Sequence, residues 1–266
     1  MIKALVSIEM DLASSMAVRL ACQLGGLMEM EIHPVYAKKS PSHEESMGAG
    51  WASRTWQREM IEEGRQEISQ LLLSEQDFCP VLRDPRIIYG DREAELVKIM
   101  HTEGFNLYLE GVHFSWTPHD ILRTLHGKLY QGLGSPFVLV RTLRKINKVA
   151  LLCLNTAQTD ALTKVFQSMW QGSSVPLAFA CPEKSVDAED GSALAEAVDR
   201  GKKLLEDSGC VTEVLRLPNS APSGDVSDVL SEHSLVAVSP ERDLKKECPE
   251  LQWLSQVKTA SLLAFH

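Results

Sequence analysis

Residues 110–127, EGVHFSWTPHDILRTLHG, carry several side chains that can bind a small molecule or a metal ion. An apolar, strand-like run precedes this stretch, and an apolar helical pattern follows it. Many α/β proteins hold phosphate groups in such a loop, where glycines let the backbone approach the anion closely. Here Gly111 is followed by His113, Phe114 and Trp116. The ligand of such a loop has therefore either changed or been lost.

The histidines of this stretch are candidate metal ligands. His113, His119 and His126, together with Glu9 or Asp11, would supply suitable donor atoms. Their spacings of 6 and 7 residues fit no tight pair of ligands on one helix. Surface or capping histidines are therefore the favoured interpretation, and no metal is expected.

The two aromatic residues of this stretch allow two interpretations, and the common catalytic motifs are absent from the sequence. Phe114 and Trp116 would stack on a base or on a partner, or would fill an old pocket, and the second interpretation is favoured. The chain contains no G-x-S-x-G, no Walker G-x-x-x-x-G-K-[ST] and no strand-linked G-x-G-x-x-G. The sequence therefore predicts no enzyme.

The predicted strands and helices that position these residues form an internal repeat of two halves. ALVSIE at 4–9 and ALLCLN at 150–155 lie 146 residues apart. Each reads as a buried strand and leads into an amphipathic helix. In both halves, strands continue to alternate with helices up to the apolar runs PFVLV (136–140) and SLLAF (261–265). This order predicts two five-stranded parallel sheets flanked by helices, in domains 1–144 and 145–266.

Ligands of such sheets bind beyond the carboxyl ends of the strands. The first and fourth strands of the first half are predicted to end near residues 9 and 111. The candidate ligand-binding residues are therefore Glu9, Asp11, Gly111, His113 and Arg123. The corresponding stretches of the second half are 155–159 and 239–244.

The whole pattern resembles a tandem universal stress protein of the adenine-nucleotide α-hydrolase-like superfamily. The match rests on LVSIEMDLASSMAVRLA, GDREAELVKIMHTEGFNLYLEG and GSPFVLVR. The resemblance implies two Rossmann-like domains whose fifth strands meet, so that the chain forms a pseudo-dimer of its own halves. A further homodimer and an unidentified protein partner stay open.

Nucleotide-binding members of this family end the fourth strand in G-x2-G-x9-G-[ST]. When Gly111 is aligned with the first glycine, Phe114 stands at the second and Thr124 near the third, and Leu125 replaces the hydroxyl residue. The acidic residue that handles the nucleoside corresponds to Glu9, and in the second half to Asn155. The resemblance therefore implies an eroded nucleotide site.

The start of the helix after this loop supports the same interpretation. Thr117 is predicted to be the N-cap, Pro118 the first helical residue and Asp120 the third. The Asp120 carboxylate would then occupy the helix end at which phosphate would otherwise bind.

Composition narrows the class of protein further. The formal net charge is −9, and acidic residues outnumber basic residues in both halves. Neither half therefore has the basic surface that nucleic-acid or anionic-membrane binders need. No apolar run reaches the ~18–20 residues that span a bilayer. The six cysteines form no C-x-x-C and are expected to be reduced, buried thiols of a cytoplasmic protein.

These observations predict a non-enzymatic universal stress protein, a regulatory or stress-response binding module without a cofactor. Two alternatives stay open. One is a protein that binds ATP, AMP or another small ligand in a rebuilt pocket, and the other is a cryptic nucleotide hydrolase.

Overall fold

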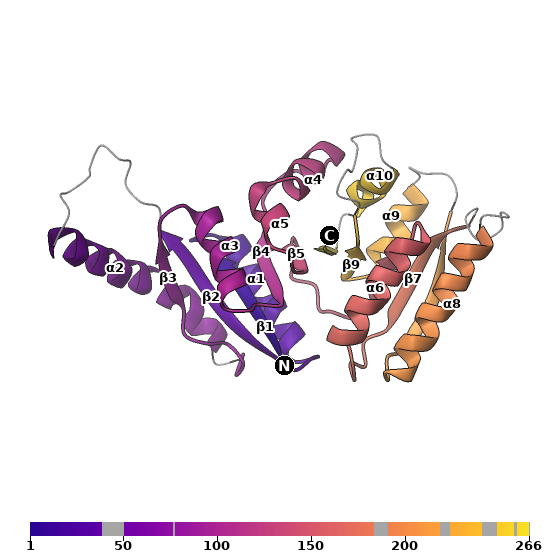
Figure 1. Ribbon diagram of the computed structural model, residues 1–266, viewed down its shortest axis with the longest axis horizontal. Coiled ribbons are helices and arrows are strands. Elements are labelled where there is room, and N and C mark those ends of the chain that lie inside the picture. Colours follow the sequence, from indigo (N-terminus) through magenta and orange to yellow (C-terminus); the bar gives the residue numbers. More distant parts are fainter. Residues whose placement is uncertain are drawn as a thin grey trace.

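The computed structural model describes residues 1–38, 51–76, 78–183, 191–218, 224–240, 249–257 and 260–265. Strands and helices alternate along both halves (Figure 1). In the first half they are β1 (Ile2–Ile8), α1 (Leu12–Gly25), β2 (Met30–Lys38), α2 (Trp51–Gln76), β3 (Arg86–Tyr89), α3 (Arg92–Thr102), β4 (Leu107–Gly111), α4 (Pro118–Leu125), α5 (Lys128–Gly132) and β5 (Phe137–Val140). In the second half they are β6 (Val149–Leu152), α6 (Thr156–Met169), β7 (Leu177–Pro182), α8 (Gly191–Asp207), β8 (Thr212–Leu217), α9 (Gly224–Ser231), β9 (Leu235–Val238), α10 (Pro249–Gln256) and β10 (Ser261–Ala264).

The described strands form one sheet in the order β3-β2-β1-β4-β5-β10-β9-β6-β7-β8. All neighbours pair in parallel except β5 and β10, which pair antiparallel with Leu139 opposite Leu262. The predicted α/β fold and the predicted meeting of the two fifth strands are confirmed. Each apolar edge strand covers the other, so neither remains free to pair with another molecule. The predicted division at residues 144 and 145 lies between β5 and β6 and stays a prediction.

Helices cover both faces of the sheet. One face packs against α1, α2, α6 and α8, and the other packs against α3, α4, α5, α9 and α10. Each of these two cores contains buried residues from both halves. The apolar interior is therefore continuous across the junction between β5 and β10.

A second contact joins the halves above the sheet, where α4 lies beside α10 (Figure 1). The Trp116 indole donates a hydrogen bond to the Leu254 carbonyl at 2.7 Å, and the Arg141 guanidinium donates to the Val257 carbonyl at 2.7 Å. Arg141 also lies over the Trp116 ring, 4.3 Å from its centroid. Two first-half side chains thus hold the carboxyl end of a second-half helix.

The repeat has a different register from the one that the sequence suggested. Ala4 packs on the α1 side of the sheet, whereas Ala150 packs on the opposite side. A shift of one residue turns a strand over, so the 146-residue offset is wrong within the strands. The buried positions of α1 and α6 match instead at an offset of 145, which places Ala13 and Ala17 against Gln158 and Leu162.

The expectation that all cysteines are reduced is also wrong. Cys22 of α1 forms a disulfide with Cys79, which lies beyond α2, with their Cα atoms 5.5 Å apart. Packing brings together two residues 57 positions apart, and no sequence motif signals such a pair. Cys153, Cys181 and Cys210 are buried free thiols as expected, and Cys248 lies outside the described residues.

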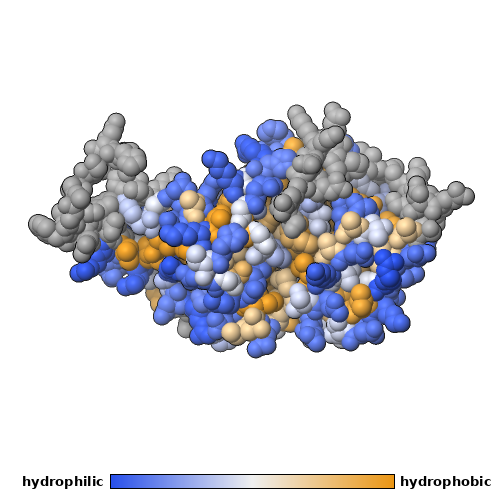
Figure 2. Space-filling view, in the orientation of Figure 1, coloured by the Kyte–Doolittle hydropathy of each residue, from blue (hydrophilic) through white to orange (hydrophobic). Residues whose placement is uncertain are grey.

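Hydrophilic residues predominate on the face shown in Figure 2, and the apolar residues between them form small groups. Near the carboxyl end of β1, Met10 and Leu12 are 56% and 71% exposed. Within the described part of the chain, no helix combines the length and apolar character needed to cross a bilayer.

Candidate functional site

A cleft of about 430 Å³ lies at the carboxyl end of β4. Strand β4, the start of α3, and helices α4 and α5 with their connections supply its walls. The lining residues that matter below are Arg92, Glu110, Gly111, His113, Phe114, Arg123 and Tyr130. This is the edge of the sheet at which ligands of parallel α/β proteins bind.

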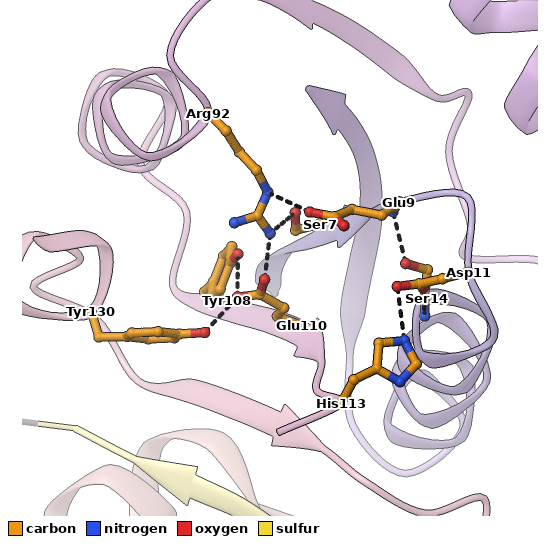
Figure 3. A network of polar contacts seen from close by, with 9 residues as sticks. All are labelled: Ser7, Glu9, Asp11, Ser14, Arg92, Tyr108, Glu110, His113 and Tyr130. Atoms are coloured by element: carbon orange, nitrogen blue, oxygen red, sulfur yellow. Dashed lines mark hydrogen bonds and ion pairs between the residues drawn. The ribbon is translucent and has the colours of Figure 1, made fainter. Parts of the chain in front are cut away.

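Arg92 is the central cation of this region (Figure 3). It ion-pairs with Glu110, lies 3.3 Å from the Glu9 carboxylate and donates a hydrogen bond to the Ser7 hydroxyl at 2.8 Å. Burial alone would lower the pKa of the guanidinium, but the oxygens of Tyr108, Glu110 and Glu9 outweigh it and raise that pKa. The positive charge of Arg92 is therefore permanent and is neutralised by the protein's own carboxylates.

Two tyrosines donate hydrogen bonds to the Glu110 carboxylate. The hydroxyls of Tyr108 and Tyr130 both donate to Oε2 of Glu110, at 3.0 and 2.5 Å. Burial, together with the negative charge of Glu110, raises the pKa of both tyrosines well above its usual value. Both phenols therefore stay protonated and act as fixed donors.

Asp11 and His113 form a second, more exposed pair (Figure 3). The His113 imidazole Nε2 lies 2.9 Å from one Asp11 oxygen, and the other oxygen accepts the Ser14 backbone N–H at 2.8 Å as the N-cap of α1. Burial works against the Asp11 charge, but the hydrogen bonds from Ser14 and His113 outweigh it and lower the pKa of Asp11. Both carboxylate oxygens are thus engaged within the protein.

Gly111 has a packing role. A Cβ atom at this position would stand 2.0 Å from the Ala13 carbonyl oxygen and 2.7 Å from the Ala13 Cβ. Only glycine lets the end of β4 come this close to the first turn of α1. The absence of a side chain is therefore required by the contact between strand and helix, whether or not a ligand binds.

The amino end of α4 is closed by its own side chains, as the sequence predicts. The Thr117 hydroxyl accepts the Asp120 backbone N–H at 3.1 Å and donates to the Asp120 carboxylate at 2.7 Å, and Pro118 is the first helical residue. The hydrogen bond from Thr117 outweighs burial and, with Arg123, lowers the pKa of Asp120. The Arg123 guanidinium lies 3.1 Å from the same carboxylate and is 67% exposed.

Phe114 and Trp116 stack in nearly parallel planes, 5.3 Å apart at an interplanar angle of 12°. Phe114 lines the cleft, and the expectation that it fills a former pocket stays a prediction. Trp116 departs from that expectation, because its indole reaches the carbonyl of Leu254 in the second half. The aromatic pair therefore links the cleft to the contact between the halves.

The five predicted site residues gather at this edge of the sheet. Gly111, His113 and Arg123 line the cleft, Asp11 binds His113, and Glu9 faces Arg92. The sequence did not single out Arg92, Glu110, Tyr108 and Tyr130, although they form the most densely bonded part of the site. A signal existed for Glu110 only, since it immediately precedes Gly111 at the predicted strand end.

The second half has no corresponding charged network at the described positions. Asn155 caps α6 by accepting the Gln158 backbone N–H at 2.9 Å. It therefore takes the role of Asp11, and its predicted correspondence with Glu9 is wrong. At the offset of 145, Leu154 stands in place of Glu9. Most of the predicted 239–244 stretch lies outside the described residues.

Within the described residues, no group of three or more His, Cys, Asp or Glu side chains could hold a metal ion. The molecule is of the doubly wound α/β class, with a polar cleft at the carboxyl ends of the first half's strands.

The fold is shared with universal stress proteins. The chain matches a universal stress protein from Archaeoglobus fulgidus DSM 4304 over 99% of its length and 97% of that chain, with a TM-score of 0.57 and 10% identity. A chain of Pseudomonas aeruginosa UCBPP-PA14 assigned to the universal stress proteins matches over 99% and 92%, with a TM-score of 0.54 and 13% identity. No protein-family model and no curated protein matches the chain. At these identities the likeness establishes the fold.

Proposed function

We propose that this chain is a non-enzymatic binding module of the universal stress protein type whose first-half cleft no longer accepts the phosphates of a nucleotide. Its role would lie in stress physiology or regulation, through binding. The observation that carries the proposal is that each feature of the cleft suited to an anion is occupied by the protein itself.

Three such features are present. The N-terminus of α4 is closed by Thr117 and Asp120. The cations Arg92 and Arg123 face Glu110 and Asp120, respectively. A phosphate would have to displace a carboxylate from each cation, or lie beside it against like-charge repulsion.

The loop backbone supports the same proposal. In the alignment with the family pattern G-x2-G-x9-G-[ST], Phe114 stands at the second glycine. Gly111, aligned with the first, is already packed on Ala13. A single Phe114→Gly change is therefore expected not to create ATP binding, because Asp120 still occupies the helix end.

The protein as purified gives a simple test. Its ultraviolet spectrum should show no nucleotide shoulder near ~260 nm, and its denatured extract should contain no stoichiometric nucleotide by mass spectrometry. A nucleotide present at about one per chain would refute the eroded-site proposal. Release of phosphate from ATP by the purified protein, abolished by Arg92→Met, would refute its non-enzymatic part.

The cleft itself favours a second candidate function, the binding of another small ligand. About 430 Å³ is within the range of ligand pockets, and Phe114 and Tyr130 offer aromatic surface beside the exposed edges of His113 and Arg123. Thermal-shift screening of small neutral and charged metabolites should find such a ligand. The stabilisation should be lost in Arg123→Ala and kept in the control variant Lys148→Ala in the second half.

A further inference from the structure

Two free thiols lie side by side at the carboxyl edge of the second half. Cys153 directly follows β6, and Cys181 is in β7. Leu152 pairs with Ala180, and the Cys153 backbone N–H donates to the Ala180 carbonyl at 2.9 Å. Cys153 and Cys181 are therefore the next cross-strand neighbours. The first half shows the same register, since Ile8 and Tyr36, which lie 145 positions earlier, are paired.

Both sulfurs point to the same face of the sheet. Leu152 and Ala180 pack toward α9 and α10, whereas Cys153 and Cys181 pack toward α6 and α8. The two side chains are 0% and 1% exposed, and each thiol donates to a backbone carbonyl of its own strand, Cys153 to Leu151 at 3.3 Å and Cys181 to Phe179 at 3.7 Å. The sulfurs are thus enclosed together in an apolar layer.

We propose that Cys153 and Cys181 form an oxidisable thiol pair, which hydrogen peroxide converts reversibly into a second disulfide of the chain. Neighbouring strands lie about 4.7–4.9 Å apart, and disulfides join Cα atoms about 4.4–6.8 Å apart. The bond therefore requires rotation of the two side chains and little movement of the backbone.

The chemistry proceeds in two steps. One of the two sulfurs attacks a peroxide oxygen, the O–O bond breaks, and hydroxide leaves and takes up the thiol proton as water. The other sulfur then attacks the resulting sulfenic acid, the S–S bond forms, and the sulfenic oxygen leaves as a second water with the proton of the second thiol. Two thiols and one peroxide thus give one disulfide and two waters, and the sulfurs lose the two electrons that the peroxide gains.

The surroundings of the two sulfurs argue against a metal as the occupant of this site. Structural zinc takes four ligands, and the described residues supply no third donor beside the two sulfurs. A complex of two thiolates with a univalent ion would also leave a net negative charge in an apolar layer. A disulfide is neutral and has no such cost.

Trypsin separates the two cysteines and provides the test. Cleavage after Lys148, Lys164 and Lys184 gives peptides 149–164 and 165–184, each with one cysteine. The folded full-length protein is treated with a graded excess of peroxide, free thiols are blocked with an alkylating agent, and the digest is analysed without reduction. We expect the two peptides joined, about 2 Da lighter than their sum, in an amount that rises with peroxide and disappears after dithiothreitol.

Variants and a folding control make the outcome decisive. Cys210→Ala removes a buried thiol at another place and should leave the joined peptide at its wild-type level, whereas Cys153→Ser should abolish it. Circular dichroism recorded during oxidation reports whether the chain stays folded. The proposal is overturned if the folded wild-type protein keeps both cysteines alkylatable after unfolding, if either cysteine goes to sulfinic acid unpaired, or if the joined peptide forms only in denatured protein.

Discussion

The carboxyl edges of the two halves use the same strand positions for different purposes. In the first half, Ser7 and Glu110 lie in register on β1 and β4 and both contact Arg92. In the second half, the offset of 145 places Leu152 at the position of Ser7. Val238, the last residue of β9, stands at the position that Glu110 has in β4, because Leu151 pairs with Ala237 as Val6 pairs with Leu109. At the described positions, this edge of the fold thus accommodates a charged network in the first half and apolar side chains in the second.

The carboxyl edges of the two halves also differ in how they are stabilised. In the second half, the buried side chains of Leu152 and Val238 occupy these positions, and no charge is desolvated there. The first half instead holds a buried arginine that must keep its carboxylate partners. The stability of the first half therefore depends on the pairing of Arg92 with Glu110 and Glu9.

The largest expected effect comes from copying the second half into the first. Glu110→Val leaves Arg92 buried with only Glu9 close by, so the free energy of unfolding should fall by about 3–5 kcal/mol. Arg92→Met combined with Glu110→Val should recover much of that loss, because no charge is then left without its partner. Urea denaturation measures both. If Glu110→Val lowers the free energy of unfolding by less than about 1 kcal/mol, a valine serves at this position as well as the charged network does.

Gly111→Ala should cost about 2–3 kcal/mol, because the new Cβ would collide with the backbone of Ala13. Gly26→Ala is the matched control, since its backbone is helical with φ −80° and its nearest contact would be 3.4 Å away. Chemical denaturation of both variants separates a packing role from a general effect of alanine. Equal stability of the two variants would contradict the packing role of Gly111.

Trp116→Phe tests the contact that joins the halves. It removes the hydrogen bond to the Leu254 carbonyl and replaces the indole beneath Arg141 with a smaller ring that binds a cation less strongly, so the free energy of unfolding should fall by about 1–2 kcal/mol. Hydrogen exchange should quicken at α10 more than at α3. Equal changes at both helices would mean that Trp116 only stabilises its own loop.

A smaller effect concerns the two helix caps. Because the pKa of Asp11 is lowered in the folded state, its contribution to stability is present above its ordinary value of 3.8 and is lost as pH falls through the lowered value. Asp11→Asn keeps a capping side chain, as Asn155 does in α6, and should remove this part of the acid dependence. Asn155→Asp should add a similar dependence to the second half. Acid-unfolding curves of the three proteins provide the measurement, and parallel curves would contradict the assignment.

The alternation of apolar strands and amphipathic helices was enough to predict the fold, because each buried strand reads as a short apolar run. The pairing of β5 with β10 was implied by the resemblance to tandem universal stress proteins, and the apolar character of both strands agreed with it. The sequence could not distinguish an offset of 146 residues from one of 145, because both align apolar residues with apolar residues. The packing of Ala4 and Ala150 on opposite faces of the sheet shows that 145 is correct.

The candidate site was predicted in part for a similar reason. Asp11, Gly111 and Asp120 lie at turns and caps, where residue type has local meaning. Arg92 gains its role from contacts with Glu110, 18 positions away, and with Ser7, 85 positions away. The disulfide of Cys22 and Cys79 was missed because it too depends on tertiary contact alone.

The central claim, that the first-half edge is closed to phosphate by the protein's own side chains, is tested most directly by titration with ATP and magnesium. A ligand at 100 times its dissociation constant stabilises the folded state by about 2.7 kcal/mol, enough to raise the melting temperature by a few degrees. With millimolar ATP and magnesium, the melting curve of the wild-type protein should stay unmoved, and calorimetry should record no binding heat beyond dilution. A clear rise in melting temperature that disappears in Arg92→Met would contradict the claim and establish a working nucleotide site.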